Sequence, residues 1–332
     1  MMDVDPELHS LASVLERVDE RARIGSDTPV VWPTGFSLLD DILDGGLRSG
    51  NLILLAGPQG EGKTTMSLQI ARNIAAAGQA VLYFCYEHDP EVLLGRLVSL
   101  ESGLRYGSQA PNQDRFRRLF EDESATPDGL VGRLQTLPTA AEALGAVLDY
   151  QDLFHIHRST GSTTNIKVIA EAVDQVRRAT GQTPLVIVDY LQKVKADSAF
   201  ESERATEIVE DLKDLAIMHQ VPVLAISASD KAGLLSGKRM RAHHLRGSTA
   251  LAYECDVLLI LNNKYDIVSR QHLAYAANAE SFRQWVVLSV EKNRNGRAGI
   301  EMEFRKHFEQ NRFDPDGALV REQLVDERLI LE

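Results

Sequence analysis

The chain has 332 residues, 44% of them hydrophobic and 25% charged, an ordinary composition for a globular protein with one large domain and short extensions. The formal net charge of -12 excludes a general nucleic-acid coat, so any contact with nucleic acid requires a local basic patch. The apolar runs are too short for a membrane span, the N-terminal residues lack a secretory signal, and Cys85 and Cys255 lie in or beside predicted strands, which indicates a reduced, cytoplasmic protein.

Residues 1–24 are predicted to form a separate helix, followed by a linker over residues 25–33. Asp5 suits the N-cap and Pro6 the first helical position. Apolar side chains then recur at helical spacing at Leu8, Leu11, Leu15, Val18 and Ala22. An amphipathic helix on a linker must bury its apolar stripe. The pattern leaves two alternatives open, which are packing on its own domain and packing on a neighbouring subunit.

Strand and helix patterns alternate from residue 34 onward. The predicted strands are 52–56, 80–85, 153–157, 185–189, 222–227, 257–261 and 285–290. Helices are predicted within 34–50, after Thr64, after Pro90, and at 166–179 and 208–219, and residues 103–150 are interpreted as a helical insertion. The alternation predicts an α/β fold with a mostly parallel twisted sheet that helices flank on both faces.

The segment Leu52–Ala56 leads into a glycine-rich turn that fits G-x-x-x-x-G-K-[ST], the phosphate-binding loop. Its glycines let backbone N–H groups point at phosphate oxygens, and the lysine places a positive charge between the β- and γ-phosphates. The threonine hydroxyl suits Mg²⁺. The sequence therefore predicts an ATP and Mg²⁺ site formed by Gly57, Pro58, Gln59, Gly60, Glu61, Gly62, Lys63, Thr64 and Thr65.

Two carboxylates follow predicted strands. Asp189 ends an apolar strand, where a nucleotide-bound Mg²⁺ requires an acidic partner beside Thr64. Beside a phosphate-binding loop this interpretation is favoured over a carboxylate that only caps a turn. Glu87 follows another strand and suits a base that polarises an attacking water. It equally suits an acid in the first turn of the next helix, so both interpretations stay open.

Two basic segments stand out in this acidic chain. Residues 230–246 carry five cations against one acid, and phosphates of a nucleic-acid backbone and a solvated surface loop explain them equally well. The cations are Lys231, Lys238, Arg239, Arg241 and Arg246. Lys292 and Arg294 lie on a turn after a strand, from which an arginine finger reaches a neighbour's γ-phosphate. Their position alone favours an ordinary surface hairpin.

These pieces occur in a recognisable order. TGFSLLDDILDGGLRSGNLILLAGPQGEGKTT is followed by YFCYEHDPEVLLGRLV, VIVDYLQKV, HQVPVLAISAS, LRGSTALAYECDVLLIL and EKNRNGRAGIEMEF. From about Thr34 to about Phe313 the chain resembles the C-terminal motor domain of the DnaB-like replicative hexameric helicases, within the RecA-like ATPases. VDYLQ and KNRNG in this order are the most specific parts of the resemblance.

The resemblance implies a RecA-like P-loop NTPase fold over residues 31–314, preceded by a linker-type helix within residues 1–30 and followed by a tail at 315–332. It implies DNA replication as the process, single-stranded DNA as the partner, and a ring built from copies of the chain, which is a hexamer in that family. It implies roles for Lys63 and Thr64 at nucleotide and Mg²⁺, Glu87 as catalytic base, Asp189 at the metal, Lys292 and Arg294 acting in trans, and Arg246, Gly247 and Ser248 on DNA.

The chain also departs from that family. We expect no primase-binding N-terminal domain here, because about 30 residues precede the motor. Ala228 stands where the family has a glutamine that senses the γ-phosphate, and Ala252 and Tyr253 replace polar residues. These departures favour a rival function, a regulatory or scaffold ATPase without unwinding activity. A nucleotide sensor without turnover is a third alternative.

Overall fold

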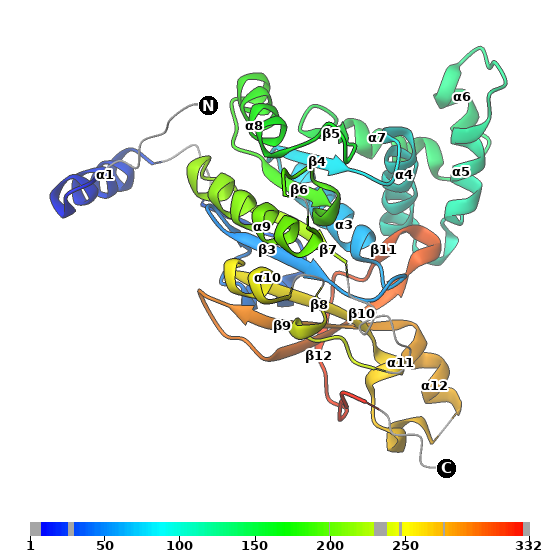
Figure 1. Cartoon of the computed structure of the whole chain (residues 1–332). Helices are drawn as coiled ribbons and strands as arrows, with labels where there is room; N and C mark the ends of the chain where they lie inside the picture. Colours follow the sequence, from blue (N-terminus) through cyan, green and yellow to red (C-terminus); the bar gives the residue numbers. More distant parts are fainter. Residues whose placement is uncertain are drawn as a thin grey trace.

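The computed structural model describes residues 8–25, 30–198, 200–228, 238–245, 248–274 and 276–327, with the backbone alone at 201, 202, 248, 249 and 276–278. A central sheet dominates these residues, with strand order β11-β10-β9-β8-β3-β7-β6-β4-β5 and β12 paired with β10 (Figure 1). The strands β8, β3, β7, β6, β4 and β5 are parallel, and β9, β10, β11 and β12 pair antiparallel at the other side of the sheet.

The bounds of the sheet strands are β3 Leu52–Ala56, β4 Val81–Cys85, β5 Phe154–Arg158, β6 Leu185–Asp189, β7 Val223–Ser227, β8 Val257–Asn263, β9 Trp285–Asn293, β10 Ile300–His307, β11 Arg312–Phe313 and β12 Ala318–Leu319. A separate ribbon pairs β1 Val31–Trp32 with β2 Leu47–Arg48. The predicted strands at 52–56 and 185–189 agree with β3 and β6 at both ends, since each is a continuous apolar run of the kind that a doubly covered parallel sheet requires.

The helices are α1 Leu11–Ile24, α2 Ser37–Ile42, α3 Lys63–Ala76, α4 Pro90–Tyr106, α5 Gln113–Glu121, α6 Gly129–Leu134, α7 Ala140–Leu148, α8 Ile166–Thr180, α9 Glu201–Met218, α10 Ser248–Glu254, α11 Lys264–Ile267 and α12 Ala276–Arg283. Short 3-10 turns η1–η5 lie between them. The predicted insertion at 103–150 is helical, as expected, and contributes the end of α4 together with α5, α6 and α7. None of the helices within the described part of the chain is long and apolar enough to cross a membrane.

The sheet is buried on both faces, as the alternation of helices and strands predicts. Along β3, Ile53 and Leu55 join one apolar cluster and Leu52 and Leu54 join the other. The first cluster includes side chains of α3, α4 and α7, and the second includes side chains of α8, α9 and α10. This three-layer arrangement fixes the carboxyl ends of β3, β4, β6 and β7 along one edge, where open α/β sheets bind ligands.

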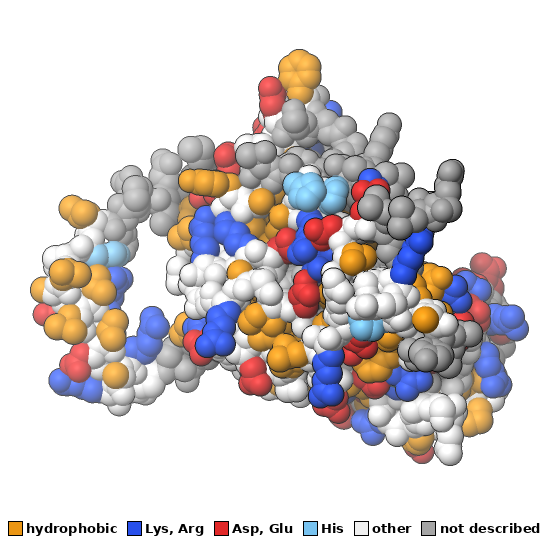
Figure 2. Space-filling model, turned by 90° about the horizontal axis from the view of Figure 1, so that it is seen from below, with side chains coloured by type: hydrophobic (Ala, Val, Ile, Leu, Met, Phe, Trp, Pro, Cys, Tyr) orange, Lys and Arg blue, Asp and Glu red, His pale blue; other side chains and the backbone are white. Residues whose placement is uncertain are grey.

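The helix α1 lies apart from the body of the fold (Figure 1). It begins after Ser10, whose Oγ accepts a hydrogen bond from the Ser13 N–H, whereas the predicted cap at Asp5 and Pro6 lies outside the described residues. None of its side chains is buried, and Leu11 is 88% exposed. Figure 2 shows hydrophobic side chains uncovered on this arm. In the structure α1 therefore does not pack on its own domain.

Several elements lie outside the sequence prediction, among them β1, β2, β11, β12, α10, α11 and α12. Two further differences have a clear physical reason. Strand β10 lies outside the predicted set, because Glu301 and Glu303 alternate with buried Met302 and Phe304 in a strand that is half-solvated. Helix α9 begins at Glu201, seven residues before the predicted start, because its first turns are charged. Both differences arise where polar side chains interrupt the apolar pattern that identifies an element.

Candidate active site

The turn between β3 and α3 requires residues without a side chain. Gly62 has φ +87°, and a Cβ there would lie 2.6 Å from Phe308 Cζ and 2.7 Å from Phe313 Cζ. A Cβ at Gly57 would lie 2.7 Å from the Leu261 carbonyl oxygen. Both contacts are closer than a Cβ tolerates, so β8 and the segment after β10 hold this loop against the sheet and demand glycine in it.

The loop is prepared for an anion. The N-cap of α3 is Gly62, which has no side chain to accept a hydrogen bond from the first turn. The N–H groups of that turn are therefore available to donate to a ligand. Lys63 Nζ donates to the carbonyl oxygens of Gly57 at 2.8 Å and Pro58 at 2.9 Å. Burial lowers the pKa of Lys63, and nearby carboxylates partly oppose the shift. A phosphate would supply the negative charge that this buried cation lacks in the loop.

Asp189 lies at the carboxyl end of β6 and is 2% exposed. Its Oδ2 accepts hydrogen bonds from Thr64 Oγ1 at 2.8 Å and from the Tyr83 hydroxyl at 3.1 Å. Burial raises the pKa of Asp189, and these two hydrogen bonds oppose the shift. A hydroxyl and a buried carboxylate in contact are hard oxygen ligands, so the donor set fits Mg²⁺.

A pocket of about 530 Å³ brings the predicted site residues together. Its lining includes Lys63, Thr64, Glu87 and Asp189, and Glu87 is exposed toward solvent at the end of β4. The volume is in the range of nucleotide and other small-molecule sites. The pocket is lined by Gln59, Gly60, Gly62, Lys63, Thr64, Thr65, Glu87, His88, Arg96, Gln113, Asp189, Tyr190, Ile226, Ala228, Phe308 and Asn311.

One loop residue faces away from the pocket. The Glu61 carboxylate accepts hydrogen bonds from Asn263 Nδ2 at 3.3 and 3.4 Å and pairs with Lys306 Nζ at 3.4 Å. Glu61 therefore ties the loop to β8 and β10 through its side chain. Gly57 and Pro58 contribute their carbonyl oxygens to Lys63 and are likewise absent from the pocket lining among the described residues.

Besides Ala228, seven lining residues lie outside the predicted site. His88, Tyr190 and Ile226 adjoin predicted site residues or lie in a predicted strand, whereas Arg96, Gln113, Phe308 and Asn311 come from other segments. Phe308 packs edge-on against Phe313, with ring centroids 5.4 Å apart, and lies over Gly62. Arg96 belongs to α4 and Gln113 to α5. No local motif marks these positions, because they reach the pocket from segments far along the chain.

Ala228 lines the pocket just beyond the end of β7. Its N–H donates to Gln192 Oε1 at 3.1 Å, and Gln192 Nε2 donates to Ser227 Oγ at 3.1 Å. Gln192 therefore joins the end of β7 to the turn after β6. The methyl group of Ala228 offers no hydrogen bond to a phosphate.

Lys292 and Arg294 lie at the opposite edge of the sheet. The Arg294 N–H donates to the carbonyl of Asp256, immediately before β8, while the phosphate-binding loop follows the end of β3. In the parallel register Ala56 pairs with Ile260, four residues beyond Asp256, which is about 13 Å along the strand. The pair therefore faces away from the nucleotide pocket of its own chain.

The predicted open basic loop is wrong for Arg239. Its side chain is 3% exposed, donates to Ser289 Oγ at 3.0 Å and forms an ion pair with Glu301. Arg241 is 31% exposed and pairs with Glu291 and Asp326, each at 2.9 Å. The physical reason is that β9, β10 and the C-terminal segment present carboxylates to these arginines, which no local pattern reveals.

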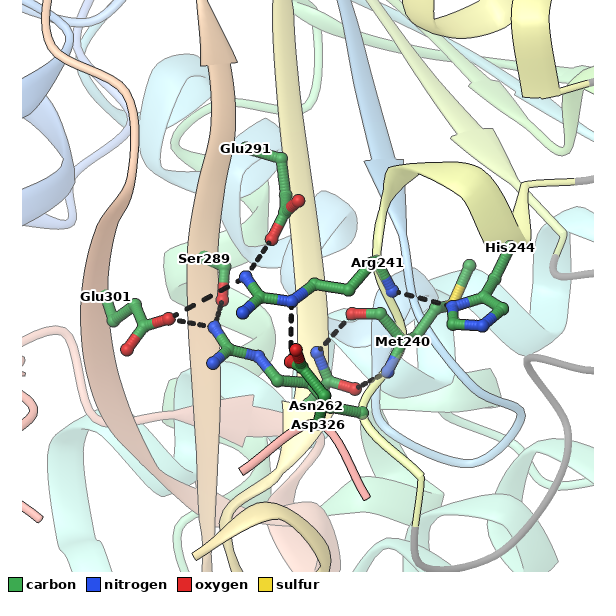
Figure 3. Close-up of polar contacts among 9 residues, drawn as sticks. Met240, Arg241, His244, Asn262, Ser289, Glu291, Glu301 and Asp326 are labelled. Carbon is green, nitrogen blue, oxygen red and sulfur yellow. Dashed lines mark hydrogen bonds and ion pairs between the residues drawn. The ribbon is translucent and has the colours of Figure 1, made fainter. Parts of the chain in front are cut away.

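The C-terminal segment, residues 320–327, runs along the basic segment 238–241. Lys238 Nζ pairs with Glu327 at 3.1 Å, and the Arg239 N–H donates to the Asp326 carbonyl at 2.8 Å. Asn262 fixes the same segment, because its Oδ1 accepts a hydrogen bond from the Met240 N–H and its Nδ2 donates to the Met240 carbonyl oxygen (Figure 3). The C-terminal segment thus occupies Lys238 and Arg241, two of the cations predicted to meet DNA. Arg246, Gly247 and the Ser248 side chain lie outside the described residues.

Comparison with known proteins gives several relatives described as replicative DNA helicases. The replicative DNA helicase DnaB of Haemophilus influenzae is 27% identical over 315 residues, 92% of this chain and 60% of that protein. The protein of the same name from Treponema pallidum is 26% identical over 303 residues, 90% of this chain and 59% of that protein. The chain therefore spans about three fifths of the length of these relatives.

A solved structure described as a DnaB-like replicative helicase and its interactions with primase has the same fold, with a TM-score of 0.70 and 21% identity over 92% of this chain and 68% of that one. The RecA-like fold expected from the motifs is therefore confirmed. The family model of the DnaB-like helicase C-terminal domain matches residues 32–314, which contain the loop, both carboxylates and the distal cations. The chain belongs to the DnaB-like helicase C-terminal domain family.

Proposed function

We propose that this chain is an ATP-hydrolysing motor that acts on single-stranded DNA as a ring of identical subunits. The observation that carries the proposal is the convergence of Lys63, Thr64, Glu87 and Asp189 on one pocket. Family membership and the DnaB relatives support the same function. DNA unwinding during replication is the process that these relatives suggest.

The proposed reaction is in-line attack of water on the γ-phosphate of ATP. Lys63 would leave the carbonyls of its own loop and neutralise the β- and γ-phosphates, and the N–H groups at the start of α3 would bind the phosphate oxygens. Glu87 would accept a hydrogen bond from the attacking water and orient it. Thr64 and Asp189 would hold Mg²⁺, which supplies charge neutralisation on the phosphates when it is bound.

A neighbouring subunit would complete the site. Lys292 and Arg294 face away from their own pocket, so they contribute to catalysis only if another copy presents its pocket to them. Arginine fingers that act in this way accelerate phosphoryl transfer about 10³–10⁵-fold. The trans arrangement requires an oligomer whose interface joins the amino-terminal strand edge of one subunit to the carboxyl-terminal edge of the next. Such a head-to-tail interface forms a ring when the rotation between subunits closes and an open filament when it does not.

The exposed stripe on α1 supports the same assembly. Leu11, Leu15 and Val18 are uncovered in the single chain. A groove of about 520 Å³ between α8 and α9 offers an acceptor on a second copy. The apolar side chains of the groove include Ile166, Ala170, Leu215 and Met218, and its acidic rim includes Glu171, Asp174, Asp211 and Asp214. The helix α1 carries three arginines, Arg17, Arg21 and Arg23.

The DNA contacts remain a proposal on the sequence resemblance. Arg246, Gly247 and Ser248 are the candidates for the phosphate backbone, and Lys238 and Arg241 join them only when the C-terminal segment releases them. Exposed ion pairs of this kind contribute about 0–1 kcal/mol, so a DNA phosphate can replace a carboxylate at low cost. Arg239 is omitted because its side chain is buried.

Ala228 favours one rival, a regulatory or scaffold ATPase without unwinding activity, because its methyl group cannot report the γ-phosphate to a DNA loop. An ATPase assay with added single-stranded DNA distinguishes the two functions when it is run at low and at moderate salt, about 50 mM and about 200 mM. The motor is stimulated by DNA, and its DNA affinity falls with salt as counterions are released. A turnover rate that DNA leaves unchanged at both salts would support the scaffold.

A further inference from the structure

Asp256 is the centre of a buried network at the amino-terminal edge of the parallel strands. Its side chain is 7% exposed. One carboxylate oxygen, Oδ2, accepts from the Leu52 N–H at 2.8 Å and from Lys213 Nζ at 2.7 Å. Leu52 begins β3 and Lys213 belongs to α9, so two rigid elements of the core fix the position of this carboxylate.

The second oxygen of the same carboxylate holds Arg294. Arg294 Nη1 donates to Asp256 Oδ1 at 3.3 Å, and Arg294 Nη2 donates to the Tyr253 carbonyl at 2.6 Å. The backbone N–H of Arg294 also donates to the Asp256 carbonyl at 2.9 Å. The guanidinium is therefore fixed at two of its nitrogens, although its side chain is 43% exposed. A long exposed arginine would otherwise sample many rotamers.

Lys292 lies on the same support. Its Nζ donates to the carbonyl oxygens of Ala252 and Tyr253, each at 2.8 Å. These carbonyls belong to the last turn of α10, where the carbonyl oxygens of a helix attract cations. Both cations are thus held side by side at the end of α10, and only the arginine has a carboxylate to orient it.

We propose that Asp256 is the positioning residue for Arg294, orienting its guanidinium toward the nucleotide pocket of the adjacent subunit. This inference rests on the proposed action of Arg294 in trans. Asp256 makes no contact with the nucleotide pocket of its own chain, since the strand register separates the two by about 13 Å or more. We therefore expect its effect on turnover to be exerted through Arg294. A purely structural role, joining β3 to α9 through Lys213, is the alternative that the experiment must exclude.

The test uses full-length chains mixed in equal amounts before ATPase measurement. Asp256→Asn keeps the shape and an acceptor oxygen but removes the charge that orients the arginine. Alone, it is expected to lower turnover 10-fold or more (about 1.4 kcal/mol) with an unchanged KM for ATP. Mixed with Lys63→Ala subunits, whose Arg294 is intact, it is expected to recover activity. Mixed with Arg294→Ala subunits it is expected to recover no activity, because neither variant supplies a correctly oriented Arg294 to its neighbour.

The controls separate the two roles and the two proposals. Lys213→Met removes the other cation on the same carboxylate and is expected to lower the melting temperature while turnover stays within twofold. Equal loss in Lys213→Met and Asp256→Asn, without recovery in either mixture, would show a structural role. If Arg294→Ala fails to recover with Lys63→Ala, the trans action itself is refuted. Recovery of Arg294→Ala but not of Asp256→Asn refutes only the positioning role. Should Asp256→Asn not fold, Asp256→Glu replaces it in the same mixtures. It keeps the charge but lengthens the side chain by one methylene and so displaces the guanidinium, and it is expected to show the same loss alone and the same recovery with Lys63→Ala.

Discussion

Gly62 offers a direct test of how the phosphate-binding loop is packed. Gly60 and Gly62 have nearly the same positive φ, +85° and +87°, so alanine at either position costs about 1–2 kcal/mol for the positive φ. At Gly60 a Cβ meets nothing within 4 Å, whereas at Gly62 it meets the rings of Phe308 and Phe313 at 2.6 and 2.7 Å. Overpacking adds about 1–3 kcal/mol at Gly62 alone.

The free energy of unfolding is measured by urea denaturation for Gly60→Ala, Gly62→Ala and the wild type. We expect losses of about 1–2 kcal/mol for Gly60→Ala and about 2–5 kcal/mol for Gly62→Ala, from the sum of the two costs. Phe308→Ala combined with Gly62→Ala is expected to show a coupling above about 0.5 kcal/mol, because the smaller side chain makes room for the new methyl group. Equal losses at the two glycines, or additivity with Phe308→Ala, would refute the packing argument.

Three further predictions concern buried and paired charges. Asp189→Asn is expected to abolish turnover yet raise the melting temperature. Burial raises the pKa of Asp189, so the folded protein holds this proton more tightly than the unfolded chain does. The stability of the wild type therefore falls as the pH rises from the ordinary pKa of 3.8 toward the raised pKa. Thermal melts at a series of pH values check that the variant lacks this fall. Arg239→Met is expected to cost about 1–3 kcal/mol of stability, measured by denaturation, because it leaves a carboxylate partner unpaired, and to leave the salt dependence of DNA binding unchanged. Asp326→Asn with Glu327→Gln is expected to tighten binding of a labelled oligonucleotide and steepen its salt dependence, since it removes the carboxylate paired with Lys238 and one of the carboxylates paired with Arg241, which keeps Glu291; weaker binding would mean that the C-terminal segment supports the DNA contact instead.

Local sequence patterns predicted the parts of the fold that depend on local chemistry. The strands Leu52–Ala56 and Leu185–Asp189 are continuous apolar runs, and the glycine-rich turn between a strand and a helix has one common physical use. Their placement at one sheet edge follows from parallel alternation, so the proximity of Asp189 to Thr64 was predictable.

The remaining features depend on partners far away in the chain. Arg239 looked like a surface cation because Glu301, 62 residues later, gives no local signal. Phe308 directly follows β10, so its contact with Gly62 depends on the pairing of that strand, and β10 itself alternates polar and apolar residues. The support of Arg294 by Asp256 needs the antiparallel pairing of β8 with β9. Such contacts arise from topology, which single-residue patterns do not encode.

The proposed mechanism requires Glu87 to act on a triphosphate held by Lys63. The decisive measurement compares ATP binding and turnover in Glu87→Gln and Lys63→Ala, with fluorescent nucleotide for binding and phosphate release for turnover. The account predicts that Glu87→Gln binds nucleotide like the wild type while turnover falls about 10²–10⁴-fold, and that Lys63→Ala loses both. Wild-type turnover in Glu87→Gln, or tight nucleotide binding with full turnover in Lys63→Ala, would contradict it.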